Sequence, residues 1–341
     1  MKLDVYIPPG DKLLPGIATL AREAEALGFA GLWTNETRHE PFLPLAVAAG
    51  HTRTIELGTA IAVAFARSPM HTAQTAWDLQ DYSGGRLLLG LGTQVRAHVE
   101  RRFGMPWGAA VPQLREYILA LRAIWRAFQT DDRLDFQGRY YRHTLLTPFF
   151  NPGPIGHPAI PIYIAGVNAG LARLAGELCD GYHVHMLNSP AYLREVVRPA
   201  VAAGAARAGR DPAAVTLASA VFVVTGADAA ARAVARERAR EQIAFYASTP
   251  TYRVVLAVHG WEDVGEALSQ LARARRWADL PALVTDDMLR AFTVEAAPGE
   301  VGPALRERYA GLLDRVACYV PTFVPSRDEA FWRAMRRSFA E

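Results

Sequence analysis

The sequence has 341 residues, of which 51% are apolar and 21% charged, and its formal net charge is +3. This composition is that of an ordinary globular protein and excludes a disordered, collagen-like or fibrous chain. So small a net charge gives no indication of binding to nucleic acid or to an anionic membrane surface. The length suits either two domains or one large α/β barrel, at about 150 residues per domain.

The cysteines and the first residues of the chain indicate in which cellular compartment the protein is expected. Cys179 and Cys318 are far apart and lie in no CxxC pattern, which is typical of a reducing environment. Asp4 interrupts the first apolar run, and no apolar stretch reaches the roughly 18 residues that a membrane-spanning helix needs. We therefore expect a cytoplasmic protein with no membrane segment.

Short apolar runs alternate with longer amphipathic segments along the chain. Residues 15–27 carry apolar side chains at helical spacing and are followed by Gly28, a typical helix end. Residues 86–91 have a continuously apolar middle, as in a parallel strand that is covered on both faces. Strands are predicted at 3–7, 31–34, 55–65, 86–91, 160–165, 182–185, 215–225 and 315–320. Helices are predicted at 15–27, 43–49, 69–82, 111–128, 169–179, 191–208, 228–246 and 328–339.

Eight strands, each followed by a helix, favour a closed parallel (β/α)8 barrel over an open doubly wound sheet. We interpret residues 1–341 as one such barrel domain, class α/β. Two segments break the rhythm: 131–161, a small hairpin and a proline-rich loop after the fourth unit, and 248–312, which is helical with little strand signal. Active sites of such barrels lie at the C-terminal ends of the strands, so residues at those ends are the candidates.

The fourth strand ends in small residues. Gly92, Thr93 and Gln94 follow Gly90, but Val95 stands where a dinucleotide fingerprint needs its third glycine, which excludes that motif. The small residues indicate either a tight turn or a backbone that an anion can approach.

The fifth strand ends Ala165, Gly166, Val167, Asn168 and leads into a helix. Asn168 is an expected helix N-cap. The same geometry also offers N–H groups to a phosphate, and both interpretations stay open.

Two further strand ends carry titratable side chains. Glu36 follows the second strand in a polar segment, and it is either part of a solvated loop or a carboxylate acting at the barrel mouth. His183 and His185 are two residues apart on one strand face, but no third ligand accompanies them, so we expect no metal site. His185 ends its strand, and we interpret it as a hydrogen-bonding or proton-donating group. His98 and Arg102 have helix-face spacing and either lie on the surface or reach an anion.

A set of short motifs resembles the luciferase-like family of flavin- and F420-dependent oxidoreductases. The motifs are residues 28–33 with Glu36, 57–61, 67–69, 72–74, 83–86, 89–93, 164–166 and 180–181. They keep the order and spacing of the family over nearly the whole chain. Residues 37–42 and 96–103 resemble the subgroup that uses coenzyme F420.

The resemblance implies a (β/α)8 barrel with an insertion after the fourth βα unit and a cofactor across the C-terminal mouth. It also implies a non-prolyl cis peptide between Ala60 and Ile61 behind the cofactor ring. The phosphate contacts carried over from the family are Gly92, Thr93, Gln94, Gly166 and Val167. It further implies a homodimer formed through the helices at 43–49 and 69–82, whose outer sides we expect to be rich in alanine and leucine.

The chain departs from the family's proton-handling pattern. Glu36 and Thr37 stand where some F420 dehydrogenases have aspartate and histidine, and Thr93, Gln94 and Val95 stand near the position of a family glutamate. We predict an F420-dependent oxidoreductase with Glu36 as orienting residue and His185 as proton donor. An FMN-dependent monooxygenase and a non-catalytic flavin-binding barrel are the alternatives.

The substrate is expected to be a small organic molecule. Aromatic residues gather in the two irregular segments, at Phe136, Tyr140, Tyr141, Phe149, Phe150, Tyr252 and Trp261. They predict either a pocket for an apolar or ring-bearing substrate or packing within a lid.

Overall fold

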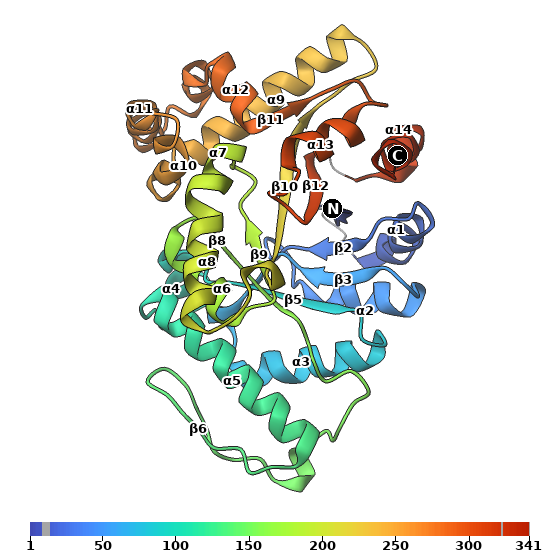
Figure 1. Ribbon diagram of the computed structural model, residues 1–341, viewed down its shortest axis with the longest axis vertical. Coiled ribbons are helices and arrows are strands. Elements are labelled where there is room, and N and C mark those ends of the chain that lie inside the picture. The colour runs from blue at the N-terminus through green and yellow to red at the C-terminus, as the bar shows by residue number, and fades with distance from the viewer. Residues whose placement is uncertain (9–13, 322, 341) are drawn as a thin grey trace.

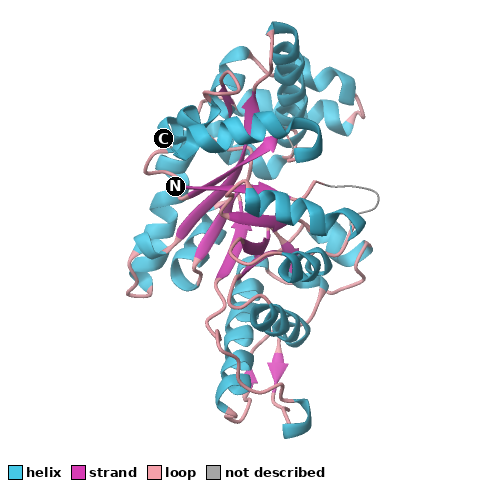
Figure 2. Cartoon of the chain, turned by 90° about the vertical axis from the view of Figure 1, so that its right-hand side faces the viewer, coloured by secondary structure: helices cyan, strands magenta, loops and turns pink. Residues whose placement is uncertain are grey.

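The computed structural model describes residues 1–8, 14–321 and 323–340. Its central feature is a closed parallel barrel (Figures 1 and 2). The barrel strands are β1 (Lys2–Tyr6), β2 (Gly31–Thr34), β3 (Glu56–Thr59), β4 (Ala62–Val63), β5 (Leu87–Gly92), β8 (Ile162–Gly166), β9 (Gly181–Val184), β10 (Thr216–Val224) and β12 (Arg315–Val320). They pair in the order β1-β2-β3-β5-β8-β9-β10-β12, and β12 pairs again with β1. The prediction of a (β/α)8 barrel is confirmed.

Helices surround this barrel. They are α1 (Leu14–Ala26), α2 (Phe42–His51), α3 (Pro69–Tyr82), α4 (Arg96–Arg101), α5 (Ala110–Thr130), α6 (Ala169–Leu178), α7 (Pro190–Tyr192), α8 (Arg198–Arg207), α9 (Ala229–Ala247), α10 (Arg253–Ala257), α11 (Glu262–Arg273), α12 (Asp286–Phe292), α13 (Val301–Tyr309) and α14 (Pro325–Ala340). None of the helices in the described ranges has the length and apolarity to cross a membrane.

The predicted third strand is divided in two. A cis peptide bond joins Ala60 to Ile61 between β3 and β4, where the resemblance places it. Gly90 of β5 allows this break, because a Cβ atom there would lie 1.7 Å from the carbonyl oxygen of Thr59. The Thr59 hydroxyl bonds the N–H and C=O of Gly90 at 2.9 and 2.6 Å and so replaces the interrupted ladder.

The barrel is closed at its base by a buried ion pair between its first and last strands. Arg315 on β12 donates two hydrogen bonds to Asp4 on β1, at 2.7 and 2.8 Å, and the Trp33 indole donates a third at 2.9 Å. Both charged side chains are 3% exposed, and Arg315 also pairs with Glu56 at 2.6 Å, so each buried charge has a counter-ion.

Segment 131–161 lies away from the barrel mouth, contrary to our expectation that it shapes the pocket. Its hairpin, β6 (Phe136–Gln137) with β7 (Arg142–His143), lies on the outer side of α5, and Figure 1 shows it at the opposite end of the molecule from α9–α12. Glu116 of α5 holds it by accepting from the N–H groups of Tyr140 and Tyr141. The physical reason is that the hairpin folds back along the outside of α5. Gln113 in the first turn of that helix donates to the Tyr141 hydroxyl at 3.1 Å, so the aromatic side chains of the hairpin pack on α5 instead of lining the cavity.

Segment 248–312 contains helices α10–α13 and a short strand that the sequence pattern missed. This strand, β11 (Thr293–Glu295), pairs with the end of β10 and extends the sheet beyond the barrel.

The outer sides of α2 and α3 differ from the expected alanine- and leucine-rich surface. The alanines of both helices face inward, since Ala48, Ala73 and Ala76 are fully buried. Leu43 is the large apolar side chain that α2 exposes, and α3 exposes mostly polar residues together with Tyr82. Small-residue packing therefore gives no support to a dimer through these helices.

Candidate active site

A cavity of about 1060 Å³ opens at the C-terminal ends of the barrel strands. All nine residues predicted to bind a cofactor line it, together with His185. They are Ala60, Ile61, Gly92, Thr93, Gln94, Ala165, Gly166, Val167 and Asn168. The fold therefore brings together residues from the ends of four strands, β3, β5, β8 and β9.

The segment of the cis peptide forms one wall of the cavity. Its backbone is tied to the end of β2, because the N–H of Ala60 donates to Thr34 at 2.6 Å and the N–H of Glu36 donates to the carbonyl of Ile61 at 3.1 Å. The Ile61 side chain packs on Gly92, where an added Cβ would lie 2.6 Å from its Cδ1 atom. Ala60 and Ile61 thus present a fixed apolar surface to the cavity.

Beside this wall, the end of β5 makes a sharp turn before α4. Gln94 has the left-handed backbone angle φ of 57°, and its own side-chain oxygen accepts from the N–H of Val95 at 2.9 Å. Thr93 donates to the Gln94 carbonyl at 3.1 Å. Backbone groups at this turn are therefore held at the cavity edge by local hydrogen bonds.

The end of β8 leads into the first turn of α6. Asn168 takes the N-cap position, but its side chain makes no capping hydrogen bond, so its amide is available to the cavity that it lines. Tyr182 lies beneath Gly166, with its hydroxyl 3.0 Å from where a Cβ atom would be. This hydroxyl is buried and has no hydrogen-bond partner among the described residues.

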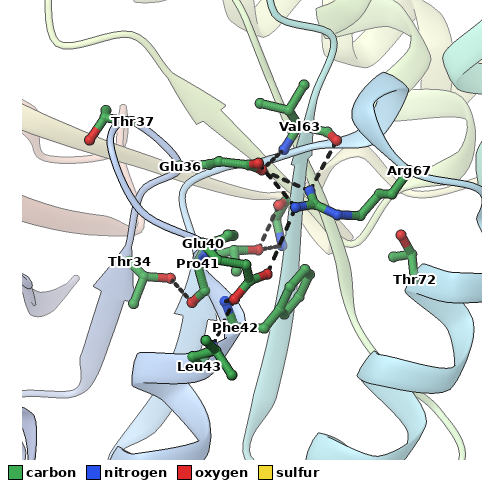
Figure 3. A network of polar contacts seen from close by, with 12 residues as sticks. Thr34, Glu36, Thr37, Glu40, Pro41, Phe42, Leu43, Val63, Arg67 and Thr72 are labelled. Atoms are coloured by element: carbon green, nitrogen blue, oxygen red, sulfur yellow. Dashed lines mark hydrogen bonds and ion pairs between the residues drawn. The ribbon is translucent and has the colours of Figure 1, made fainter. Parts of the chain in front are cut away.

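Glu36 is not among the residues that line the cavity. Its carboxylate forms a two-armed ion pair with Arg67, at 2.7 and 3.0 Å, and accepts from the N–H of Val63 at 2.6 Å (Figure 3). Its side chain is 6% exposed. From the sequence we expected Glu36 to contact the substrate, and this geometry does not support such a contact. Instead Glu36 ties the loop after β2 to β4, through the Val63 N–H, and to Arg67 just before α3.

His185 lies just after β9 and faces the cavity. Its Nδ1 atom accepts from the N–H of Leu187 at 3.1 Å, and its Nε2 atom lies 3.2 Å from the Tyr252 hydroxyl. The Tyr246 ring packs edge-on against it, with 4.7 Å between ring centroids. Burial lowers the pKa of His185 to about 3, so the ring is neutral at physiological pH.

His183 lies deeper in the barrel, between Trp33 and Tyr163, with ring centroids 4.8 and 5.2 Å away. Burial lowers its pKa to about 3, and the positive charge of Arg315 adds to this effect. Neither ring nitrogen finds a hydrogen-bond partner within the described part of the chain. His183 is thus a neutral residue on the cavity floor.

Two other predicted residues lie at the rim. His98 and Arg102 fall in and just after α4, and both are exposed. Arg102 donates to the carbonyl of Thr37, a residue of the cavity wall, and its guanidinium lies 4.8 Å from the Phe103 ring centroid. Arg102 therefore braces the loop after β2.

Sequence reasoning missed one side of the cavity. Helix α9 lines it with residues 231, 234, 235, 238, 241 and 242. These residues are spaced so that they lie on one face of the helix, and this spacing in the sequence could have identified the face. Of the aromatic residues expected at the pocket, Tyr252 lines the cavity, whereas Trp261 stacks on His259 at 4.5 Å.

The residues present fit a flavin-sized cofactor. The apolar wall at Ala60 and Ile61 suits a flat ring, and the strand ends at Gly92 and Gly166 leave room for a phosphate to approach the backbone. The amide of Asn168, which makes no capping hydrogen bond, lies at the second of these ends, where α6 begins. Together these features define a barrel enzyme whose reactive group would be held across its mouth.

The comparisons with known proteins agree with this class. The profile of the luciferase-like monooxygenase family matches residues 8–339, and the chain belongs to that family. An uncharacterized protein of Mycobacterium tuberculosis is 46% identical over 336 residues, which cover 98% of this chain and 97% of that protein.

Two further relatives carry a functional name. The 5,10-methylenetetrahydromethanopterin reductase of Methanolobus tindarius is 29% identical over 315 residues, covering 90% of each chain. The structure of the coenzyme F420-dependent tetrahydromethanopterin reductase from Methanopyrus kandleri has a TM-score of 0.80, with 22% identity and coverage of 99% and 98% of the two chains. The second likeness shows the shared fold.

Proposed function

We propose that this protein is an F420-dependent oxidoreductase that transfers a hydride between F420 and an organic substrate. The observation that carries the proposal is the cavity at the barrel mouth, where the wall of Ala60 and Ile61 meets the ends of β5 and β8. The relatives that are named as F420-dependent or as methylenetetrahydromethanopterin reductases support the same cofactor.

Each part of the cavity has a task in this proposal. Ala60 and Ile61 would back the deazaflavin ring, while Gly92, Thr93 and Gln94 would hold the phosphate-bearing side chain together with residues 165–168. When bound, F420 supplies the hydride, and the protein supplies position and electrostatics. The opposite side, formed by β10, α9 and Tyr252, would then receive the substrate.

An FMN-dependent monooxygenase is the second candidate. It is favoured by the matching family profile, which is described as that of luciferase-like monooxygenases. FMN carries one phosphate, whereas F420 carries a phosphodiester and a glutamate tail. The two cofactors therefore need different binding groups at the cavity edge. A barrel that binds a flavin without catalysis is the third possibility.

Fluorescence titration with F420 and with FMN tests the proposal. We expect quenching by F420 at micromolar concentration and at least about tenfold weaker binding of FMN, a difference of about 1.4 kcal/mol. Tight binding of FMN alone would overturn the proposal in favour of the monooxygenase.

Turnover is then measured with reduced F420 against ketones, enones and cyclic imines, by the return of the visible absorbance of oxidised F420. Steady turnover of one class supports the oxidoreductase. Binding of F420 without turnover over this whole panel would favour the non-catalytic alternative.

A further inference from the structure

The two ring nitrogens of His185 have different partners, and this difference fixes where the ring proton lies. The backbone N–H of Leu187 points at Nδ1, 3.1 Å away. A backbone N–H can only donate, so Nδ1 must act as an acceptor and carry no proton. Since burial lowers the pKa of His185 to about 3, the ring is neutral and its single proton is on Nε2.

This tautomer sets the direction of the hydrogen bond to Tyr252. The Nε2–H group donates to the Tyr252 oxygen, 3.2 Å away, so the tyrosine proton is not used in this contact. Tyr252 lines the cavity, and its hydroxyl has no second partner in the described part of the chain. Burial also raises the pKa of Tyr252 to about 12, so the group is a hydroxyl rather than a phenolate at neutral pH.

The backbone around Tyr252 is held in place by contacts with helix α11. Tyr252 ends the short helix Pro250–Tyr252, and Ser269 of α11 donates to the carbonyl of Ser248 just before it, at 2.7 Å. Arg253, the next residue, forms an ion pair with Glu266 of α11. A side chain held in this way keeps its direction, which a donor to a bound molecule requires.

We propose that Tyr252, oriented by His185, is the catalytic hydrogen-bond and proton donor to the substrate. The substrate class that follows is a molecule with a polarised double bond, a ketone or an imine, whose oxygen or nitrogen accepts from Tyr252. His185 is a positioning residue, because its own proton faces Tyr252 and not the cavity. The proposal rests on the proposed function and moves the role of proton donor from His185 to Tyr252.

The proton and the electrons balance in this assignment. As the carbon of a C=O group accepts a hydride, the π pair moves to the oxygen, and that oxygen takes the proton of the Tyr252 hydroxyl. The phenolate that remains is held by the Nε2–H group of His185 and recovers a proton from water at the cavity mouth. Positioned acid catalysis of this kind contributes about 10²–10⁴-fold to rate.

The first experiment measures the ring nitrogens of His185 by ¹⁵N NMR in the protein without cofactor. We expect a neutral ring with its proton on Nε2 from pH 5 to pH 8. Addition of cyclohexanone, a small ketone probe, is expected to shift the Nε2 signal in the parent protein but not in Tyr252→Phe. A proton on Nδ1, a charged ring at pH 6, or an equal shift in the variant would overturn the proposal.

The second experiment compares kinetics in the F420-loaded enzyme with the ketone or imine that turns over. Tyr252→Phe should lower kcat at least about 30-fold, with KM and F420 affinity within about twofold. His185→Phe should lower kcat to a smaller extent. Tyr141→Phe is the matched control: its hydroxyl accepts from Gln113 at 3.1 Å, it does not line the cavity, and we expect kcat within about twofold of the parent.

The two proposals can fail separately. If the parent protein does not bind F420, the proposed function fails, while the ring-nitrogen measurement still decides whether His185 donates to Tyr252 and leaves the Tyr252 hydroxyl free to donate to a bound molecule. If F420 binds and a substrate turns over but Tyr252→Phe keeps its kcat, the donor assignment fails and the proposed function stands.

Discussion

Ile61 and Gly92 are in direct contact across two neighbouring strands. A Cβ atom added at Gly92 would lie 2.6 Å from both Cγ1 and Cδ1 of Ile61, closer than non-bonded carbon atoms approach one another in folded proteins. Glycine at position 92 is therefore what allows the Ile61 side chain to lie flat along the cavity wall.

We expect Gly92→Ala to displace Ile61 and to weaken F420 binding at least about tenfold, or roughly 1.4 kcal/mol. Fluorescence quenching measures the change. Gly156→Ala is the control, since an added Cβ there meets no atom within 4 Å, and its affinity should equal that of the parent. Equal affinities for all three proteins would show that this contact does not shape the cofactor site.

Glu36→Gln keeps the shape of the side chain but removes the charge that faces Arg67. We expect a loss of about 1.5–3 kcal/mol of unfolding free energy, as for a buried hydrogen bond to a charged group. Because Glu36 also holds the Val63 N–H, F420 affinity should fall as well. Urea unfolding and cofactor titration measure the two effects.

The matched control for this variant is Glu100→Gln, which breaks an exposed ion pair with Arg96. Its unfolding free energy should change by less than about 1 kcal/mol. A Glu36→Gln protein of normal stability and affinity but reduced hydride transfer would instead restore the catalytic role that the sequence suggested.

The two cavity histidines predict how stability depends on pH. Their folded pKa values of about 3 are below the ordinary value for histidine, so between about pH 6.5 and pH 3 the unfolded chain binds more protons than the folded one. Unfolding free energy should therefore fall as the pH is lowered through this range, by up to about 1.4 kcal/mol per pH unit for each histidine.

The variant His183→Phe lacks one of these two histidines, so its unfolding free energy should change less steeply with pH, by up to about 1.4 kcal/mol per pH unit. Urea unfolding at a series of pH values measures it, and NMR titration of the His183 ring in the parent protein checks it directly. A ring that titrates near pH 6.5 would contradict the prediction.

The homodimer remains a prediction of the family resemblance. If α2 is part of its interface, Leu43→Arg should produce a monomer, because Leu43 is 55% exposed on that helix. Light scattering at micromolar concentration distinguishes the two states. A parent protein that is already monomeric would contradict the predicted homodimer.

The strands were predictable because each is a short apolar run buried on both faces, as in β5. The position of these residues at the cavity was predictable because they directly follow strand ends, whose place in a barrel is known. The direction of the Glu36 side chain was not, since its partner Arg67 is 31 residues away and meets it only in the folded chain. Strand β11 was missed because its three residues are held by pairing with β10 rather than by a pattern of their own.

The ion pair between Asp4 and Arg315 has a consequence for how the protein is made. Its partners are separated by 311 residues, so at synthesis rates of about 5–20 residues per second Asp4 waits roughly 15–60 s for its counter-ion. During that time β1 can pair with β2 but not with β12, and its other edge is open to any strand that approaches. One edge of β1 therefore stays unpaired in the nascent chain until β12 has left the ribosome.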